Sequence, residues 1–134
     1  MFNIHAVDHI GIATENLETA IETFSKILGT KATEIVRLLD YNIKTSFFSM
    51  GNTKIELIAP LERNGPIIDF LAKRGKGIHH LCFKVDNIQK VTTSLKSNGF
   101  RLTNESLSID AHGRKIIFLH PSTSEGVLIE LVEE

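Results

Sequence analysis

Hydrophobic side chains follow a helical spacing in two segments of the chain. The first carries them on one face of a helix, at Leu17, Ala20, Ile21, Phe24 and Leu28. Asn16 precedes this run as a predicted N-cap, and Gly29 follows it where a left-handed residue ends a helix. The same order returns after Asn87, with Ile88, Val91 and Leu95 on one face and Gly99 as the stop. The pattern predicts two helices, each directly after a strand.

Apolar runs between turn residues predict the remaining strands. They cover about residues 32–38, 43–50, 53–59, 115–120 and 127–132. Gly51-Asn52 separates the second run from the third and is typical of a hairpin. Pro66 opens a short apolar segment that Gly75 closes, which predicts a connecting helix. The sequence therefore predicts an α+β chain in which a βαβββ unit occurs twice.

An internal repeat relates the two predicted units. The segment from Asp8 to Leu17 matches the segment from His79 to Ile88, so that His9 corresponds to His80. A second match, Ile55-Glu56-Leu57-Ile58 with Ile129-Glu130-Leu131-Val132, makes Glu56 correspond to Glu130. Because side chains alternate along a strand, His9 lies on the face opposite Ile10 and Ile12, which must meet the helix.

These two histidines and two carboxylates are unusual inside apolar strands. A single strand Glu more often faces solvent, and a single strand His is more often an ordinary core or surface residue. A buried carboxylate costs several kcal/mol unless a cation compensates it. If the two units are related by a pseudo-twofold axis, the repeat brings the four side chains together as two nitrogen and two oxygen donors. We therefore predict that His9, Glu56, His80 and Glu130 bind one divalent metal ion.

The other histidines and the cysteine receive ordinary interpretations. Strand alternation places His79 on the helix side, away from His80. His5 and His120 lie near strand ends without a partner in the repeat, which indicates exposed or locally hydrogen-bonded rings. Cys82 is the only cysteine and follows an apolar strand pattern, so we expect a small core residue rather than a nucleophile.

Composition and charge exclude several classes of partner. The chain has 134 residues, 42% of them hydrophobic, which suffices for one domain with its own core. Fifteen basic against sixteen acidic residues leave almost no net charge, so a nucleic acid is not an expected partner. Neither a signal peptide nor a membrane-spanning run is recognisable, and we expect a soluble, cytoplasmic protein without a membrane partner.

Several longer motifs resemble the methylmalonyl-CoA epimerases of the vicinal oxygen chelate (glyoxalase/bleomycin resistance/dioxygenase) superfamily. They are Asp8-His9-Ile10-Gly11-Ile12-Ala13, Gly51-Asn52-Thr53-Lys54-Ile55-Glu56-Leu57-Ile58-Ala59-Pro60-Leu61, Gly77-Ile78-His79-His80-Leu81-Cys82-Phe83, Ala111-His112-Gly113, Phe118-Leu119-His120-Pro121 and Gly126-Val127-Leu128-Ile129-Glu130-Leu131. The resemblance implies a glyoxalase-like fold, with a half-open, barrel-like mixed sheet around a metal site. It also implies a single domain over 1–134, with module one at about 5–61, a connecting helix at about 65–75 and module two at about 77–133.

The resemblance further implies an isomerase that epimerises methylmalonyl-CoA. One divalent ion (cobalt, nickel, manganese or zinc) on His9, Glu56, His80 and Glu130 would stabilise the enolate formed when a base removes the α-proton. Some members have Gln at the position of Glu56, and both residues donate oxygen. An acyl-CoA is the implied substrate, and a homodimer is the implied assembly.

Two catalytic residues and a substrate loop follow from the same resemblance. Glu130 is one candidate base, and Asp40 aligns with the second carboxylate of the family, usually a Glu. Asp40 is one methylene shorter and precedes Tyr41-Asn42 where a small Gly is common, so an ordinary loop cap is the alternative for it. His112 and Gly113 are candidate substrate contacts at the mouth of the site, with a flexible surface loop as the alternative.

Other activities fit the same four side chains. The main alternative is glyoxalase I (lactoylglutathione lyase), which moves a proton on a glutathione hemithioacetal. A ring-cleaving dioxygenase ranks third, because such enzymes add a His or Tyr and tend to be longer. A metal-free binding protein of the superfamily is a further alternative, which the four retained donors disfavour. Basic residues near strand ends are read as solvated and carry no assignment: Lys44, Lys54, Arg114 and Lys115.

Overall fold

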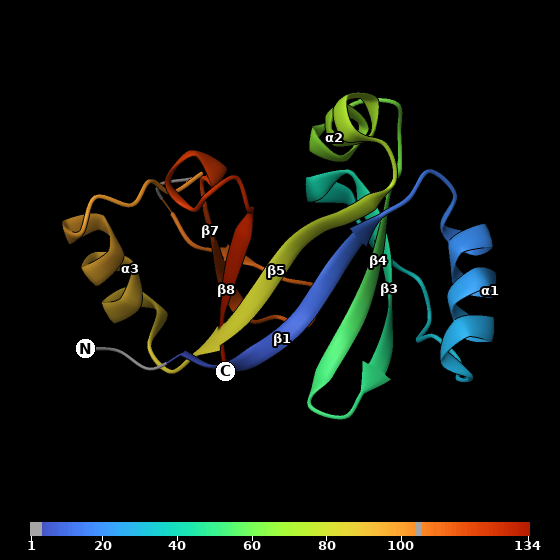
Figure 1. The fold of residues 1–134 in the computed structure, drawn as a ribbon, viewed down its shortest axis with the longest axis horizontal. Coiled ribbons are helices and arrows are strands. Elements are labelled where there is room, and N and C mark those ends of the chain that lie inside the picture. The colour runs from blue at the N-terminus through green and yellow to red at the C-terminus, as the bar shows by residue number, and fades with distance from the viewer. Residues whose placement is uncertain (1–3, 104–105) are drawn as a thin grey trace. The chain divides into compact units, whose positions relative to one another are not determined.

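The computed structural model describes residues 4–103 and 106–134. Its elements follow in the order β1 (Ile4–Ala13), α1 (Leu17–Leu28), β2 (Val36–Leu38), η1 (Leu39–Tyr41), β3 (Ile43–Met50), β4 (Thr53–Pro60), α2 (Pro66–Arg74), β5 (Gly77–Val85), α3 (Ile88–Ser97), β6 (Ser108–Ile109), β7 (Lys115–Leu119), η2 (Pro121–Thr123) and β8 (Ile129–Glu133) (Figure 1). The predicted βαβββ order therefore occurs twice, and the α+β class is confirmed. The chain divides into two compact units, Ile10–His79 and the residues up to His9 with His80–Glu134, which are described separately.

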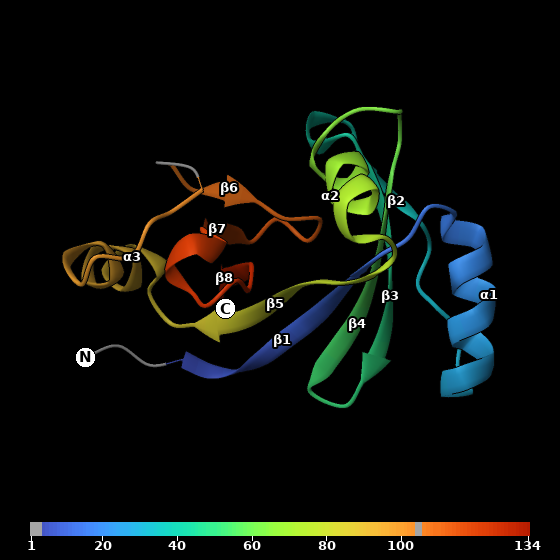
Figure 2. The same cartoon turned by 45° about the horizontal axis from the view of Figure 1, so that its top comes forward.

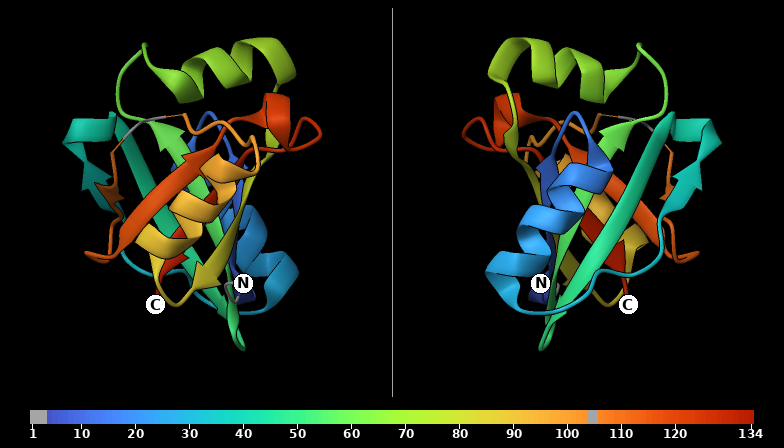
Figure 3. Two further views of the ribbon diagram at one scale, coloured as in Figure 1. Left: turned by 90° about the vertical axis from the view of Figure 1, so that its left-hand side faces the viewer. Right: turned by 90° about the vertical axis from the view of Figure 1, so that its right-hand side faces the viewer.

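The unit Ile10–His79 is a twisted sheet with a helix on one face. Antiparallel β3 and β4 pair along their whole length, and β2 continues the sheet beyond β3. The helix α1 covers one face of this sheet (Figure 3, right). That face presents Phe48, Leu57 and Ala59, against which Leu17 of α1 is fully buried. Alternation then turns Phe47, Glu56 and Ile58 to the opposite face. Glu56 therefore lies on the face that α1 leaves open.

Both predicted ends of α1 have the expected caps. The side chain of Asn16 accepts a hydrogen bond from Thr19 N at 2.9 Å, and Gly29 adopts the left-handed conformation at φ 66°. The connecting helix is also present as α2, which begins at Pro66. It packs on the face opposite α1 through Ile67, which contacts Ala13 and Ile58.

The second unit repeats this arrangement around α3. Here β5 pairs with β8 in parallel, and β8 and β7 pair antiparallel. β6 pairs with β7 at the edge (Figure 2). Side chains from one face, Val85, Ile117 and Leu131, form a core with Ile88 and Val91 of α3. Asn87 caps α3 by accepting from Lys90 N at 3.0 Å.

The limits of three strands differ from the predicted ones. Residues 32–35 are not strand, because the hydroxyl of Thr33 takes the place of a backbone acceptor and receives the N–H of Phe47. β8 begins at Ile129 rather than near 127, because Val127 N bonds back to Ser124 O in a turn. β6 has two residues, too few to produce a recognisable pattern. Among the residues described, no helix is long and apolar enough to cross a membrane.

Candidate metal centre and substrate site

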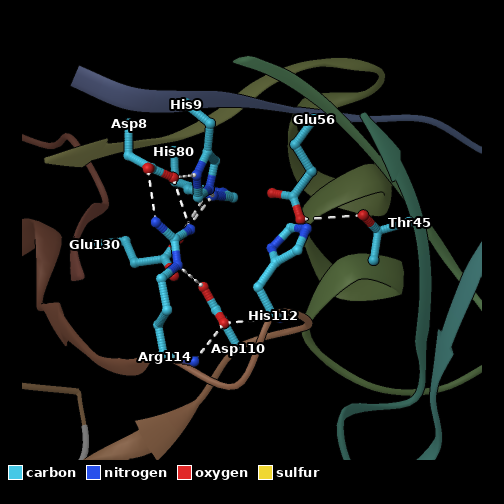
Figure 4. Close-up of polar contacts among 9 residues, drawn as sticks. All are labelled: Asp8, His9, Thr45, Glu56, His80, Asp110, His112, Arg114 and Glu130. Atoms are coloured by element: carbon cyan, nitrogen blue, oxygen red, sulfur yellow. Dashed lines mark hydrogen bonds and ion pairs between the residues drawn. The ribbon is translucent and has the colours of Figure 1, made fainter. Parts of the chain in front are cut away.

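Three of the four predicted ligands meet inside the second unit. His9 of β1, His80 of β5 and Glu130 of β8 are 3%, 3% and 4% exposed. His9 Nε2 lies 3.0 Å from His80 Nε2, and each of these nitrogens lies 3.1 Å from Glu130 Oε1 (Figure 4). The sheet register explains the meeting, since Cys82 lies opposite Glu130 in the parallel pair and places Glu130 on the face of His80.

The spacing of these three atoms fits a bound metal ion. Two donors about 2.1 Å from one ion are about 3.0 Å apart when their bonds meet at a right angle, and about 3.4 Å apart in a tetrahedron. The observed separations of 3.0, 3.1 and 3.1 Å are therefore compatible with three donor atoms that would share one ion. The donor chemistry agrees, because two imidazoles and one carboxylate suit first-row divalent metals. Further coordination positions remain for oxygen donors.

Glu130 is ionised in this environment. Its burial acts to raise the pKa, but the neighbouring rings of His80 and His9 together lower it by more, so that the net pKa falls below the ordinary range of a glutamate. The carboxylate is therefore negatively charged at neutral pH. A charged carboxylate is the form that a metal ligand or a general base requires.

A buried aspartate fixes the ring of His9. His9 Nδ1 donates to Asp8 Oδ2 at 2.7 Å, which leaves the lone pair of His9 on Nε2, the atom in the triangle. Asp8 is 1% exposed and receives Arg114 Nη1 on Oδ1 at 2.8 Å and Arg114 Nη2 on Oδ2 at 2.9 Å. Sequence reasoning missed both residues. Asp8 received no role in the sequence analysis, and Arg114 was interpreted as a solvated cation.

The predicted substrate residues lie in a tight turn that Asp110 organises. Asp110 Oδ1 accepts the N–H groups of His112 at 2.8 Å and Arg114 at 2.9 Å, and Gly113 has a left-handed φ of 78°. Both His112 and Gly113 are exposed. These hydrogen bonds give the turn a defined shape, and its part in substrate binding stays a prediction.

The fourth predicted ligand, Glu56, belongs to the unit Ile10–His79. It lies on β4 with 7% of its surface exposed, and its Oε2 accepts the hydroxyl of buried Thr45 at 3.2 Å (Figure 4). Its strand partner is Phe47, just as Phe118 is the strand partner of Glu130. The repeat therefore extends to the neighbours of both carboxylates, and both carboxylates are buried.

Asp40 lies in the 3₁₀ turn η1 and is exposed. The loop shape that a Gly would give is provided by Asn42, which adopts the left-handed conformation at φ 55° and ψ 40°. Its amide nitrogen donates to Asn64 O at 2.7 Å, and its amide oxygen accepts Glu62 N at 3.1 Å. Asn42 thus anchors the Asp40 turn to residues 62–64.

Comparisons with known proteins agree with this fold and donor set. Residues 8–118 match the Glyoxalase/Bleomycin resistance protein/Dioxygenase superfamily. The mitochondrial methylmalonyl-CoA epimerase of Homo sapiens is 41% identical over 132 residues, 98% of this chain and 75% of the human protein. The chain belongs to the methylmalonyl-CoA epimerase family. The ethylmalonyl-CoA/methylmalonyl-CoA epimerase of Cereibacter sphaeroides is 37% identical over 96% of this chain and 97% of its own.

A solved structure confirms the fold of this family member. The methylmalonyl-CoA epimerase of Mycobacterium tuberculosis superposes with a TM-score of 0.91 at 35% identity, covering 97% of this chain and 88% of that one. The glyoxalase-like fold and the family predicted from the sequence motifs are therefore confirmed. The assignment of residues to metal, bases and substrate stays a prediction.

The remaining histidines and the cysteine behave as ordinary residues of this epimerase-family chain. His79 packs edge-on against Phe70 of α2, on the predicted helix side. His120 accepts Ser122 N locally, and His5 contacts Asp86. Cys82 is fully buried, and burial raises the pKa of its thiol to about 12. Asp8, His9 and Cys82 offer three donor atoms within 4.8 Å of one another, but Arg114 already occupies both oxygens of Asp8.

Proposed function

We propose that this protein is a metal-dependent epimerase of methylmalonyl-CoA or a closely similar acyl-CoA. The buried triangle of His9, His80 and Glu130 carries the proposal, together with membership of the epimerase family. These three residues and Glu56 would hold one divalent ion. When bound, the ion acts as a Lewis acid that stabilises negative charge developing on the thioester oxygen. Cobalt, nickel, manganese and zinc are the candidate ions, because each accepts imidazole and carboxylate donors.

Two carboxylates of the chain would move the proton. The bond between the α-carbon and its hydrogen breaks, and the proton passes to the ionised Glu130 or Asp40 on that face. The second residue, in its protonated form, then donates a proton to the opposite face of the planar carbon. A single base that returned the proton from the side it came from would exchange it without inverting the centre. Epimerisation therefore requires both Glu130 and Asp40.

The turn at His112 and Gly113 is proposed to contact the acyl-CoA. The exposed imidazole can donate to a substrate oxygen, and Gly113 allows the close approach of a ligand to the backbone. The closed hydrogen bonding of Asp110 holds the turn in shape before substrate arrives. Preorganisation of this kind lowers the entropic cost of binding.

Loss of deuterium from α-deuterated racemic methylmalonyl-CoA tests the proposed function. Metal-depleted protein should be inactive, and addition of cobalt, nickel or manganese should restore both deuterium loss and interconversion of the two epimers. The glutathione hemithioacetal of methylglyoxal, assayed in parallel, tests the glyoxalase alternative. Turnover of the hemithioacetal without turnover of the acyl-CoA would replace the epimerase proposal by a lyase.

We further propose that the chain forms a homodimer. Three large apolar side chains of the unit Ile10–His79 are well exposed, namely Ile27 at 66%, Leu39 at 80% and Ile78 at 65%. Burial of such side chains against a second copy removes apolar surface from water. Sedimentation velocity at micromolar concentration should give the mass of two chains. A single species at 14.9 kDa would contradict the proposal.

A further inference from the structure

An unbroken series of hydrogen bonds connects the substrate turn to a metal ligand. Asp110 Oδ2 accepts a hydrogen bond from Arg114 Nε at 3.0 Å. The two terminal nitrogens of Arg114 each donate a hydrogen bond to one oxygen of Asp8. Asp8 Oδ2 in turn accepts His9 Nδ1 at 2.7 Å (Figure 4). All four residues belong to the second unit. The series ends on the ring whose other nitrogen faces His80 and Glu130.

Each contact in the series restricts the next side chain. A guanidinium that binds a carboxylate through two parallel hydrogen bonds fixes the plane of the carboxylate as well as its position. Asp8 therefore has one orientation, and that orientation determines the direction of the His9 ring. Arg114 is itself held from the other side, because Asp110 receives both its Nε and its backbone N–H.

From this geometry we infer that Arg114 is a positioning residue, which sets the affinity and geometry of the metal site by orienting His9 through Asp8. The inference rests on the proposed metal site. The guanidinium of Arg114 bonds to Asp110 and to both oxygens of Asp8, so its action on the site passes through Asp8. Partners that orient a metal-binding histidine typically change metal affinity about 10- to 100-fold when they are removed.

An ordinary buried ion pair is the alternative function for Arg114 and Asp8. Such a pair would affect folding of the metal-free protein and leave the metal site of the folded protein unchanged. Asp8 Oδ2 accepts hydrogen bonds from both Arg114 and His9, so a change at Arg114 can affect the His9 ring through Asp8. A measurement of metal binding by folded, substrate-free protein therefore distinguishes them.

Cobalt binding by Arg114→Ala tests the inference. We expect the affinity for Co²⁺, measured by chelator competition, to fall about 10- to 100-fold, with a changed visible spectrum of the bound ion. Arg114→Lys keeps the charge but cannot grip both oxygens, and should recover only part of the affinity. Arg101→Ala is the matched control, because it removes an exposed guanidinium of the same unit, and its affinity should equal that of the wild type.

A milder variant keeps the test decisive if Arg114→Ala does not fold. In Asp110→Asn, the amide oxygen can still accept the turn N–H groups, but the amide nitrogen cannot accept Arg114 Nε. We expect a several-fold loss of Co²⁺ affinity at unchanged thermal stability. Wild-type affinity in folded Arg114→Ala, or full affinity in both Arg114→Lys and Asp110→Asn, would overturn the inference. A wild-type protein that binds no Co²⁺ would instead refute the proposed metal site.

Discussion

Replacing Glu130 by glutamine should lower metal affinity and α-proton exchange together. Glu130 Oε1 lies 3.1 Å from the ligand nitrogens of both His9 and His80, and a neutral amide supplies less charge to the ion. The amide also cannot accept the substrate proton, a loss that typically costs about 10²- to 10⁴-fold in rate. We expect deuterium exchange and epimerisation to fall by at least about 10²-fold, as measured by NMR and chiral chromatography of the acyl group.

The control for this variant is Glu134→Gln, which removes an exposed carboxylate shortly after Glu130 in the chain. It should retain full metal content and activity. Two results would correct the account in different ways. Loss of exchange with unchanged metal affinity would leave Glu130 as a base alone. If Glu130→Gln kept both wild-type metal affinity and wild-type exchange, Glu130 would be neither a metal ligand nor a base.

Asp40→Asn should abolish epimerisation while the metal content stays at the wild-type level. Asp40 is exposed in η1, and the substitution keeps the size of the side chain while removing its basicity. If Glu130 still removes the proton on its own face, one epimer should exchange its α-deuterium without being inverted. The expected loss of inversion is about 10²- to 10⁴-fold. Polarimetry and mass spectrometry of the same reaction separate inversion from exchange.

Asp69→Asn is the matched control for Asp40→Asn, since it removes an exposed carboxylate of α2 in the same unit. It should leave both inversion and exchange unchanged. Full epimerase activity in Asp40→Asn would eliminate Asp40 as the second base. The anchoring of the turn by Asn42 would then make η1 a structural loop, and a one-base activity such as that of a glyoxalase would become the better proposal.

The internal repeat was sufficient to find the residues that meet in the second unit. Matching His9 with His80, and Glu56 with Glu130, depends only on alternation and register, which a repeated pattern reveals directly. The helix caps at Asn16 and Asn87 were also predictable, because capping uses local hydrogen bonds between near neighbours. Elements determined by local chemistry were therefore accessible from the sequence.

The hydrogen bonds that orient the His9 ring through Asp8 and Arg114 could not be predicted from the repeat. The ion pair between Asp8 and Arg114 joins residues 106 positions apart, and the repeat aligns Asp8 with His79 rather than with another carboxylate. The start of β2 was missed for a related reason, since the hydroxyl of Thr33 replaces a backbone acceptor only once β3 is in place. The cytoplasmic location and the limits of a single domain stay predictions.

The location of bound cobalt tests the central claim most directly. Crystals grown with Co²⁺ and measured at the cobalt absorption edge would give the position of the ion independently of activity. We predict one anomalous peak about 2.0–2.3 Å from His9 Nε2, His80 Nε2 and carboxylate oxygens of Glu130 and Glu56. A peak bound to other residues, or full-occupancy cobalt without Glu56 or Glu130 among its ligands, would contradict the four-ligand site.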